Sequence, residues 1–165
     1  MKTLREEIPL KKIKIIKKTI SGYLPALFGI LILYLIIFAI IGQLADEEIL
    51  GLMFLMGFVV IFITLPVFLY LYNKQYFKNY FYDMNEQYIT IRKGVFGRKE
   101  ATLPFSKITD VYIDQDILDR IFKLYDFHIS TPTEKSGDFA HIDGISKDCS
   151  EKLKRKILDK IISKN

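Results

Sequence analysis

Residues that build catalytic and redox centres are scarce in this sequence. Cys149 is the single cysteine, so an intramolecular disulfide is impossible, and its simplest interpretation is a small apolar residue on a helix face. Only two histidines occur, which leaves few side chains for general acid–base catalysis. These absences argue against a cysteine-based metal cluster and leave little material for an active site.

Charge is also absent from two long stretches. Residues 23–41 contain no Asp, Glu, Lys, Arg or His, and thirteen of these nineteen residues are Leu, Ile or Phe. A second run without such residues covers 49–72. At about 1.5 Å per residue, such a helix nearly crosses a hydrocarbon core of roughly 30 Å. We predict a transmembrane helical hairpin over residues 21–72, with spans at about 23–41 and 49–72 and a bend at Pro66. Without ionisable groups to bind an ion or relay a proton, the hairpin is interpreted as an anchor.

The formal net charge of +5 is distributed unevenly along the chain. A cluster of lysines precedes the first span, Lys74 and Lys78 follow the second, and the linker has acids at 46–48 but no base. The cluster consists of Lys11, Lys12, Lys14, Lys17 and Lys18. By the positive-inside rule, we expect a multi-pass protein of the cell membrane with both termini in the cytoplasm. Because the densest basic run abuts an apolar span, the lipid bilayer is a better partner than nucleic acid.

Residues 1–20 are predicted to form a basic amphipathic segment. Leu10, Ile13 and Ile16 recur at helical spacing between the lysines, and Pro9 suits the first turn of a helix. Two interpretations stay open. The segment lies on the inner leaflet, or it is the positively charged flank that fixes the orientation of the first span.

The sequence changes character after Tyr72, where short β-rich runs alternate with turn residues. Strands are predicted at 77–82, 88–92, 95–103, 109–114, 127–131 and 139–142. Alternation directs Ile89, Val111 and Phe127 inward, whereas Tyr112 points outward. This pattern predicts a mainly-β domain that begins at the end of the second span.

The last twenty residues are predicted to form an amphipathic helix. Apolar residues recur every four positions from Cys149 to Ile161 among basic residues, and Ser146 or Ser150 is positioned to cap the helix. Residues 73–165 are therefore predicted to form one cytoplasmic domain in which this helix closes one end of the β-structure.

Several short motifs occur in a defined order in this domain. They are Tyr88-Ile89, Lys93-Gly94-Val95-Phe96, the run from Thr102 to Val111, the run from Leu118 to Leu124, Thr131 and Gly144. Together they resemble the membrane-flanked bacterial pleckstrin-homology-like (PH-like) domains of the YdbS type over roughly residues 77–146. The two preceding spans fit the arrangement of that family.

The resemblance implies a partly open β-sandwich or barrel of about seven strands, capped by the terminal helix. It implies a role in binding and assembly, with no established catalytic activity. The full fold prediction is a two-helix transmembrane hairpin followed by this mainly-β PH-like fold and a C-terminal amphipathic helix. The family pattern usually has Gly where Lys123 stands, so the turn after Phe122 is expected to be built differently.

No catalytic residue, cofactor site or metal site is predicted. His128 and His141 have Asp138 and Asp143 nearby in the sequence, but their spacing does not set metal ligands on one face. A histidine on a strand is more often a surface or pairing residue. The acidic series 110–119 lacks the Gly and the terminal Glu of a calcium-binding loop, and no serine lies in a nucleophile-elbow pattern.

The leading hypothesis is a non-enzymatic, membrane-anchored binding or scaffold protein. Its cytoplasmic domain would contact a protein partner, a second copy of itself or the inner membrane surface, with no specific small-molecule substrate. The alternatives are an accessory subunit of an export or envelope-stress complex and a small membrane enzyme.

Candidate membrane-surface contacts are the N-terminal lysine cluster and the basic residues around Val95-Phe96. The latter are Arg92, Lys93, Arg98 and Lys99. The turn at 83–86 carries two acids where eukaryotic PH domains gather bases around phosphoinositide, so that binding mode is not expected.

Overall fold

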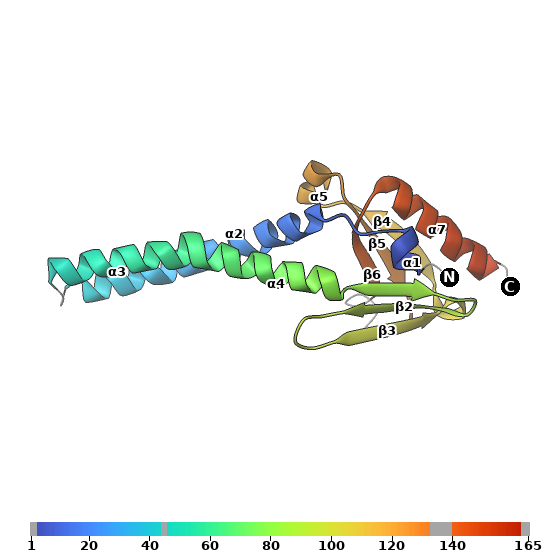
Figure 1. Ribbon diagram of the computed structural model, residues 1–165, viewed down its shortest axis with the longest axis horizontal. Helices are drawn as coiled ribbons and strands as arrows, with labels where there is room; N and C mark the ends of the chain where they lie inside the picture. Colours follow the sequence, from blue (N-terminus) through green and yellow to red (C-terminus); the bar gives the residue numbers. More distant parts are fainter. Residues whose placement is uncertain (1–2, 44–45, 133–139, 163–165) are drawn as a thin grey trace. The chain divides into compact units, whose positions relative to one another are not determined.

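A computed structural model describes residues 3–43, 46–132 and 140–162 (Figure 1). The chain forms two compact units, and each is described by itself. The helical unit comprises residues 18–74. The β unit combines the first 17 residues with the chain from Gln75 onward, so it is discontinuous in sequence.

The helical unit contains both apolar stretches. The first lies on α2 (Ile13–Ile41), and the second lies on α3 (Glu47–Val59), the π-helical turn η1 (Val60–Thr64) and α4 (Leu65–Asn79). Both are long and apolar enough to cross a membrane. The π-helical turn ends just before Pro66, whose ring crowds a preceding carbonyl and whose nitrogen cannot donate. The irregularity expected at this proline is thus a local change of helix type on its N-terminal side.

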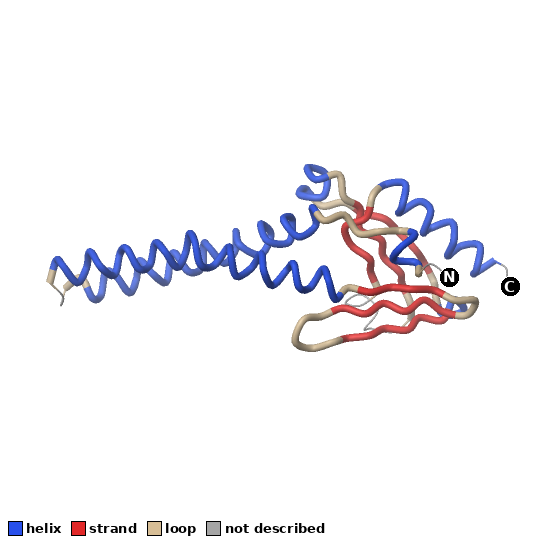
Figure 2. Tube along the Cα trace, viewed as in Figure 1, coloured by secondary structure: helices blue, strands red, loops and turns tan. Residues whose placement is uncertain are grey.

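Within this unit the two apolar helices run antiparallel and pack closely (Figure 2). The Tyr34 hydroxyl donates a hydrogen bond to the Met53 carbonyl, and the Tyr23 hydroxyl donates to the Ile61 carbonyl, each over 3.3 Å. Gly57 leaves space for an aromatic ring, because a Cβ there would lie 2.3 Å from a ring carbon of Tyr34. The predicted helical hairpin is present.

The β unit holds two three-stranded antiparallel sheets. The first contains β1 (Phe81–Met84), β2 (Tyr88–Lys93) and β3 (Lys99–Pro104), and the second contains β4 (Asp110–Asp114), β5 (Tyr125–Ser130) and β6 (His141–Ile145). In the register, Ile89 lies opposite Leu103 and Val111 lies opposite Ile129. The described residues thus form six strands, where the family resemblance implies about seven.

Three α-helices and a short 3-10 helix complete this unit. They are α1 (Leu4–Glu7), α5 (Ile117–Phe122), α7 (Lys147–Ile162) and the 3-10 helix η2 (Phe105–Lys107). Helix α7 packs on β4, β5 and η2 (Figure 1). The amide of Cys149 donates to Ser146 Oγ over 3.3 Å, so Ser146 caps this helix as predicted.

The core of the β unit lies between the sheets and α7. Its members share near-complete burial and come from both sheets, η2 and α7. They include Tyr80, Tyr82, Ile89, Ile91, Phe105, Val111, Phe127, Ile129, Ile142, Ile145, Leu153 and Ile157. The inward positions predicted from alternation are confirmed, since a strand with period two buries one face only.

The first residues of the chain form an integral part of this core. We call residues 3–17 the N-terminal strap. Leu4, Ile8 and Leu10 are buried in the core cluster, and the amide of Lys11 donates to the Gly144 carbonyl of β6 over 2.9 Å. The prediction was a separate segment at residues 1–20 and a self-contained domain at 73–165. The structure differs, because apolar residues of the strap cover the β-structure and belong to the same compact unit.

Two predicted strand boundaries are wrong. Residues 77–79 belong to α4, which continues past the apolar run, so the first strand begins only at Phe81. The third strand begins at Lys99 because Gly94 (φ 124°) and the following turn occupy the predicted start. Asp138 and the predicted strand start at residue 139 lie outside the described residues.

Lys123 adopts the left-handed backbone conformation. It ends α5 with φ 53° and ψ 47°, and the amide of Leu124 donates to the Asp119 carbonyl over 2.9 Å. The turn therefore places a side chain in a conformation where glycine would be relaxed.

We expect Ile8→Ala to destabilise the β unit by about 2–5 kcal/mol, since Ile8 is fully buried and its truncation leaves a cavity. Near-ultraviolet circular dichroism of the buried tyrosines during denaturation of the detergent-solubilised chain measures this loss. Ile117→Ala is the matched control, because Ile117 is 78% exposed and its truncation should change stability by less than about 0.5 kcal/mol. Equal effects of the two substitutions would contradict burial of the strap.

We expect Lys123→Gly to stabilise the β unit by about 0.5–1 kcal/mol, because a left-handed backbone is unfavourable for a residue with a Cβ. Thermal unfolding followed at the same tyrosine signal provides the measurement. Lys123→Ala keeps the Cβ but removes the rest of the side chain with its ammonium, so it should bring no such gain. A gain in alanine equal to that in glycine would attribute the effect to loss of the side chain beyond Cβ instead.

Candidate functional site

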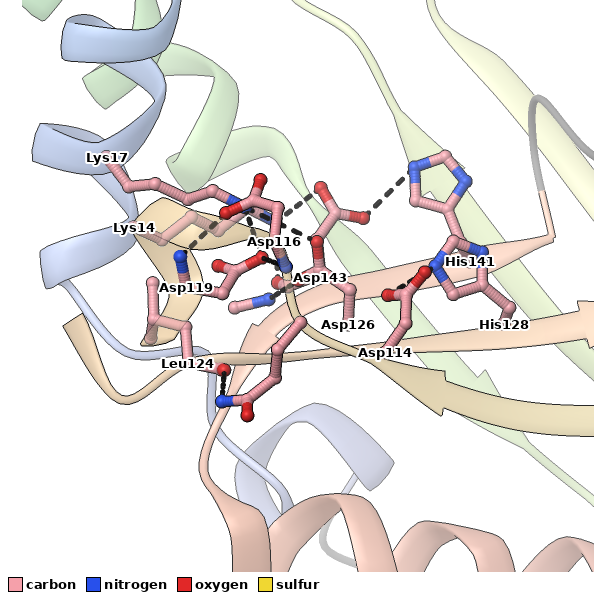
Figure 3. A network of polar contacts seen from close by, with 12 residues as sticks. Lys14, Lys17, Asp114, Asp116, Asp119, Leu124, Asp126, His128, His141 and Asp143 are labelled. Carbon is pink, nitrogen blue, oxygen red and sulfur yellow. Dashed lines mark hydrogen bonds and ion pairs between the residues drawn. The ribbon is translucent and has the colours of Figure 1, made fainter. Parts of the chain in front are cut away.

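A network of buried charges joins the strap to the second sheet (Figure 3). Lys17 lies at its centre, with its Nζ 2.6 Å from Asp119, 3.0 Å from Asp116 and 3.5 Å from Asp126. Asp119 is 1% exposed and sits in the first turn of α5, where it forms a capping box with Asp116. One ammonium group therefore gathers carboxylates from a helix start and from β5.

Lys14 occupies a second position in this network. Its Nζ donates to the Asp143 carbonyl over 2.7 Å and lies 3.1 Å from the carboxylate of the same residue. The ammonium is also 4.1 Å from the ring centre of Tyr80, a cation–π contact. Gly144 makes room for the lysine stem, because a Cβ there would lie 2.6 Å from Lys14 Cδ. The positive φ of Gly144 and this close approach both require glycine.

The network pairs buried lysines with aspartates of differing exposure, since Asp119 and Asp143 are buried whereas Asp116 is exposed. Four aspartates, at 116, 119, 126 and 143, face the ammonium groups of Lys14, Lys17 and Lys93. Burial and the nearby Asp143 carboxylate raise the pKa of Asp126. Burial opposes ionisation of Asp116 as well, but the Asp119 amide and the Lys17 ammonium outweigh it and hold the pKa of Asp116 low. The pKa values of these two aspartates are thus shifted in opposite directions because their surroundings differ.

The two histidines lie on neighbouring strands and stack on one another. The ring centres of His128 and His141 are 5.6 Å apart, and Tyr112 stacks on His128 at 4.7 Å. His128 lies 3.2 Å from Asp114, and His141 lies 3.0 Å from Asp143. This is the pairing role expected for strand histidines. Among the described residues, no group of three or more His, Cys, Asp or Glu side chains could hold a metal ion.

The predicted membrane-contact lysines of the N-terminus divide into two groups. Lys14 and Lys17 are 2% and 8% exposed and bind carboxylates inside the β unit, so their ammonium groups are not presented to a membrane surface. Lys12 is exposed, and Lys11 donates its Nζ to the Lys123 carbonyl over 3.2 Å. Lys18 is the first residue of the helical unit.

The basic residues of the β2–β3 hairpin lie around a shallow hollow. Arg92 and Arg98 are exposed and line it, Lys93 lines it from a largely buried position, and the exposed Lys99 does not. Arg5 and Lys78, which were not predicted as surface contacts, also line this hollow. The only sequence signal for Lys78 was its place after the second span, and Arg5 is 73 residues away from it.

The ion network was not predicted because its partners lie far apart in the sequence. Lys17 and Asp119 are separated by 102 positions, and Lys14 and Asp143 by 129. In the sequence, Asp116 and Asp119 belong to an acidic series that lacks a calcium-binding pattern, and the lysines indicate topology. The available hint of their burial was that Lys14 and Lys17 recur at the same helical spacing as apolar residues that are buried.

Two three-stranded antiparallel sheets closed by a C-terminal helix define a PH-like domain. A family model described as "Bacterial PH domain" matches residues 8–161, which include most of the strap and both apolar helices. The chain belongs to the bacterial PH domain family. No curated protein and no solved structure matches it in the corresponding searches.

We expect Lys17→Met to destabilise the β unit by about 3–5 kcal/mol at neutral pH, because it leaves buried carboxylates without their shared cation. Denaturation followed by the tyrosine signal measures the change. Lys12→Met is the matched control, since Lys12 is exposed five positions earlier in the strap and its replacement should be nearly neutral.

The deficit of Lys17→Met should shrink as the pH is lowered from 7 towards 4. Without the ammonium, the crowded carboxylates of the folded state hold protons more tightly than those of the unfolded chain, so protonation favours folding. In the wild type, Asp116 contributes to the pH dependence of stability with the opposite sign. Its pKa is lower in the folded than in the unfolded chain, so it stabilises the fold above the unfolded pKa, and this stabilisation is lost on acidification. A deficit that stays constant across this range would contradict the charge explanation.

Proposed function

We propose that this protein is a non-enzymatic, membrane-anchored PH-like binding or scaffold protein. Two spans anchor it in the cell membrane, and the β unit lies on the cytoplasmic side. There it contacts a protein partner, a second copy of the chain or the inner membrane surface. The observation that carries the proposal is the uncovered apolar surface of the two long helices.

That surface is extensive. In the most apolar part of the first helix no residue is buried by the protein, and in the second helix 6% are. Large apolar side chains are exposed on both helices, including Phe28 at 70% exposure and Leu52 at 60%. Water is an unfavourable environment for such surfaces, whereas a lipid core accommodates them. Helix α2 would extend about 43 Å at 1.5 Å per residue, more than the roughly 30 Å of hydrocarbon.

The discontinuous β unit supports a hairpin topology independently of charge. Residues 3–17 precede the first span, and the sheets follow the second, yet both pack into one core. Segments that share a core lie on the same side of any membrane that the helices cross. We infer that this side is the cytoplasm, because lysines precede the first span and acids occupy the linker.

A binding role fits the chemistry of the β unit better than catalysis. Its buried lysines Lys14 and Lys17 pair with aspartates of the same unit. Glu86 lies in the turn of the β1–β2 hairpin and pairs with Lys160, and Asp83 lies beside this turn in β1. Acids at this turn would repel a phosphoinositide headgroup, so the binding surface lies elsewhere.

Cysteine accessibility tests the topology. In a Cys149→Ala background, we expect Glu47→Cys to react with a membrane-impermeant maleimide added to intact cells, because Glu47 is exposed at the turn between the spans. Glu151→Cys, exposed on α7, should react only after the membrane is permeabilised.

The two positions serve as controls for one another, since both are exposed acids replaced by the same residue. Labelling of Glu151→Cys but not Glu47→Cys in intact cells would reverse the orientation. Recovery of the chain in the soluble fraction after cell disruption would contradict membrane anchoring altogether.

A further inference from the structure

A hollow of about 280 Å³ lies beside the β2–β3 hairpin, and its charge is of one sign. Among the described residues that line it, five are basic and none is acidic. The basic residues are Arg5, Lys78, Arg92, Lys93 and Arg98. They come from α1, the end of α4, β2 and the turn before β3, so folding alone brings them together.

Hydrogen bonds fix the walls of this hollow. The guanidinium of Arg5 donates to the carbonyls of Phe77 and Lys78 at the end of α4, over 3.0 and 3.2 Å. The side-chain amide of Asn79 donates to the Gly94 carbonyl in the hairpin over 3.1 Å. The strap, the end of α4 and the hairpin are thus tied to one another.

Two of the basic groups are available to a ligand. Arg92 is paired with Glu100 at 2.7 Å, and Lys93 is largely buried, 4.0 Å from Asp143. Lys78 and Arg98 are exposed, and within the described parts of the chain the structure records no ion pair for either. Both therefore present charge to the hollow that is not neutralised there.

Gathered cations of this kind favour an anion. Like charges held together repel, and a bound anion relieves the repulsion. Guanidinium groups donate two parallel hydrogen bonds to phosphate oxygens, and an ammonium supplies a point charge. The volume lies just below the roughly 300–1,000 Å³ of pockets for drug-sized molecules, which suits a headgroup-sized ligand.

The surroundings favour a phosphate carried by a lipid. Phe96, at the tip of the hairpin, is 90% exposed, and bases flank it on both strands. An exposed aromatic residue beside basic groups is typical of a contact with an anionic membrane surface. Lys78 follows the last residue of the apolar run, Tyr72, by six positions on the same helix, about 9 Å along its axis.

We propose that this hollow binds the phosphate group of an anionic phospholipid, with Lys78 and Arg98 as its principal ligands. The inference rests on the proposed membrane anchoring, which places the end of α4 near the lipid headgroups. Recognition of the phosphate predicts little discrimination among anionic phospholipids of equal charge. A larger hollow of about 470 Å³ beside α7 lacks this uniform sign, because Asp148 lines it together with Lys123 and Lys147.

Native mass spectrometry of the full chain in mild nonionic detergent tests the proposal. We expect wild type to retain phosphatidylglycerol in preference to the zwitterionic phosphatidylcholine. Lys78→Gln combined with Arg98→Gln should weaken this retention by about tenfold, since two bases near a lipid surface are lost. The matched control is Lys154→Gln with Arg155→Gln on α7, which removes the same charge away from the hollow and should leave retention unchanged.

Each contrary result has a defined meaning. An equal loss in the control pair would overturn the site, because attraction by overall charge would explain the retention. Displacement of the lipid by an equal concentration of soluble glycerol phosphate would overturn the lipid assignment in favour of a free phosphate ester. Binding of an acidic peptide that depends on Lys78 and Arg98, without retention of phosphatidylglycerol, would overturn it in favour of a protein partner.

The experiment separates this inference from the proposed function. If cysteine labelling supports the anchored topology while the hollow variant retains lipid like wild type, the lipid site alone is wrong. If the chain is soluble in cells, the anchoring fails whatever the detergent experiment gives. Circular dichroism of both double variants verifies that the exposed substitutions leave the fold intact.

Discussion

Neutralisation of buried charge is the constraint on which the β unit depends. Asp119 and Asp143 are almost completely enclosed, and their ammonium partners are Lys17 and Lys14 of the strap. An unpaired carboxylate in such a place costs several kcal/mol, so the second sheet and α5 cannot close without residues from the other end of the chain. The two apolar helices are therefore an insertion between two parts of one folded unit.

Local patterns predicted most elements of the fold. Period-two alternation placed Ile89, Ile91 and Phe127 in the core, and the four-residue repeat placed α7 with its cap at Ser146. These signals work because each depends on neighbours a few positions away. The same approach failed at residues 77–79, where the helix outlasts its apolar run and no local residue marks the extension.

Contacts between segments far apart in the chain could not be predicted from the sequence. A lysine before an apolar span has the same local pattern whether it meets phosphate, water or a carboxylate, so the burial of Lys14 could not be read from its neighbours. The basic hollow contains both residues that local patterns predicted and a residue that only a long-range contact brings there. Arg92 and Arg98 were predicted as surface contacts from their place in a hairpin, whereas Arg5 joins them only because the strap packs beside the end of α4.

The discontinuity of the β unit also orders events during synthesis. Lys17 leaves the ribosome 102 residues before Asp119, a delay of about 5–20 s at typical rates of roughly 5–20 residues per second. For most of that interval Lys14 and Lys17 have none of their carboxylate partners, and both apolar helices are synthesised in the meantime. In the proposed anchored topology, a second helix that failed to return the chain to its starting side would leave the two halves of the core on opposite sides of the bilayer. Folding of the β unit would then require correct insertion of both helices, and an incorrectly inserted chain would expose Ile8 and unpaired charge to quality control.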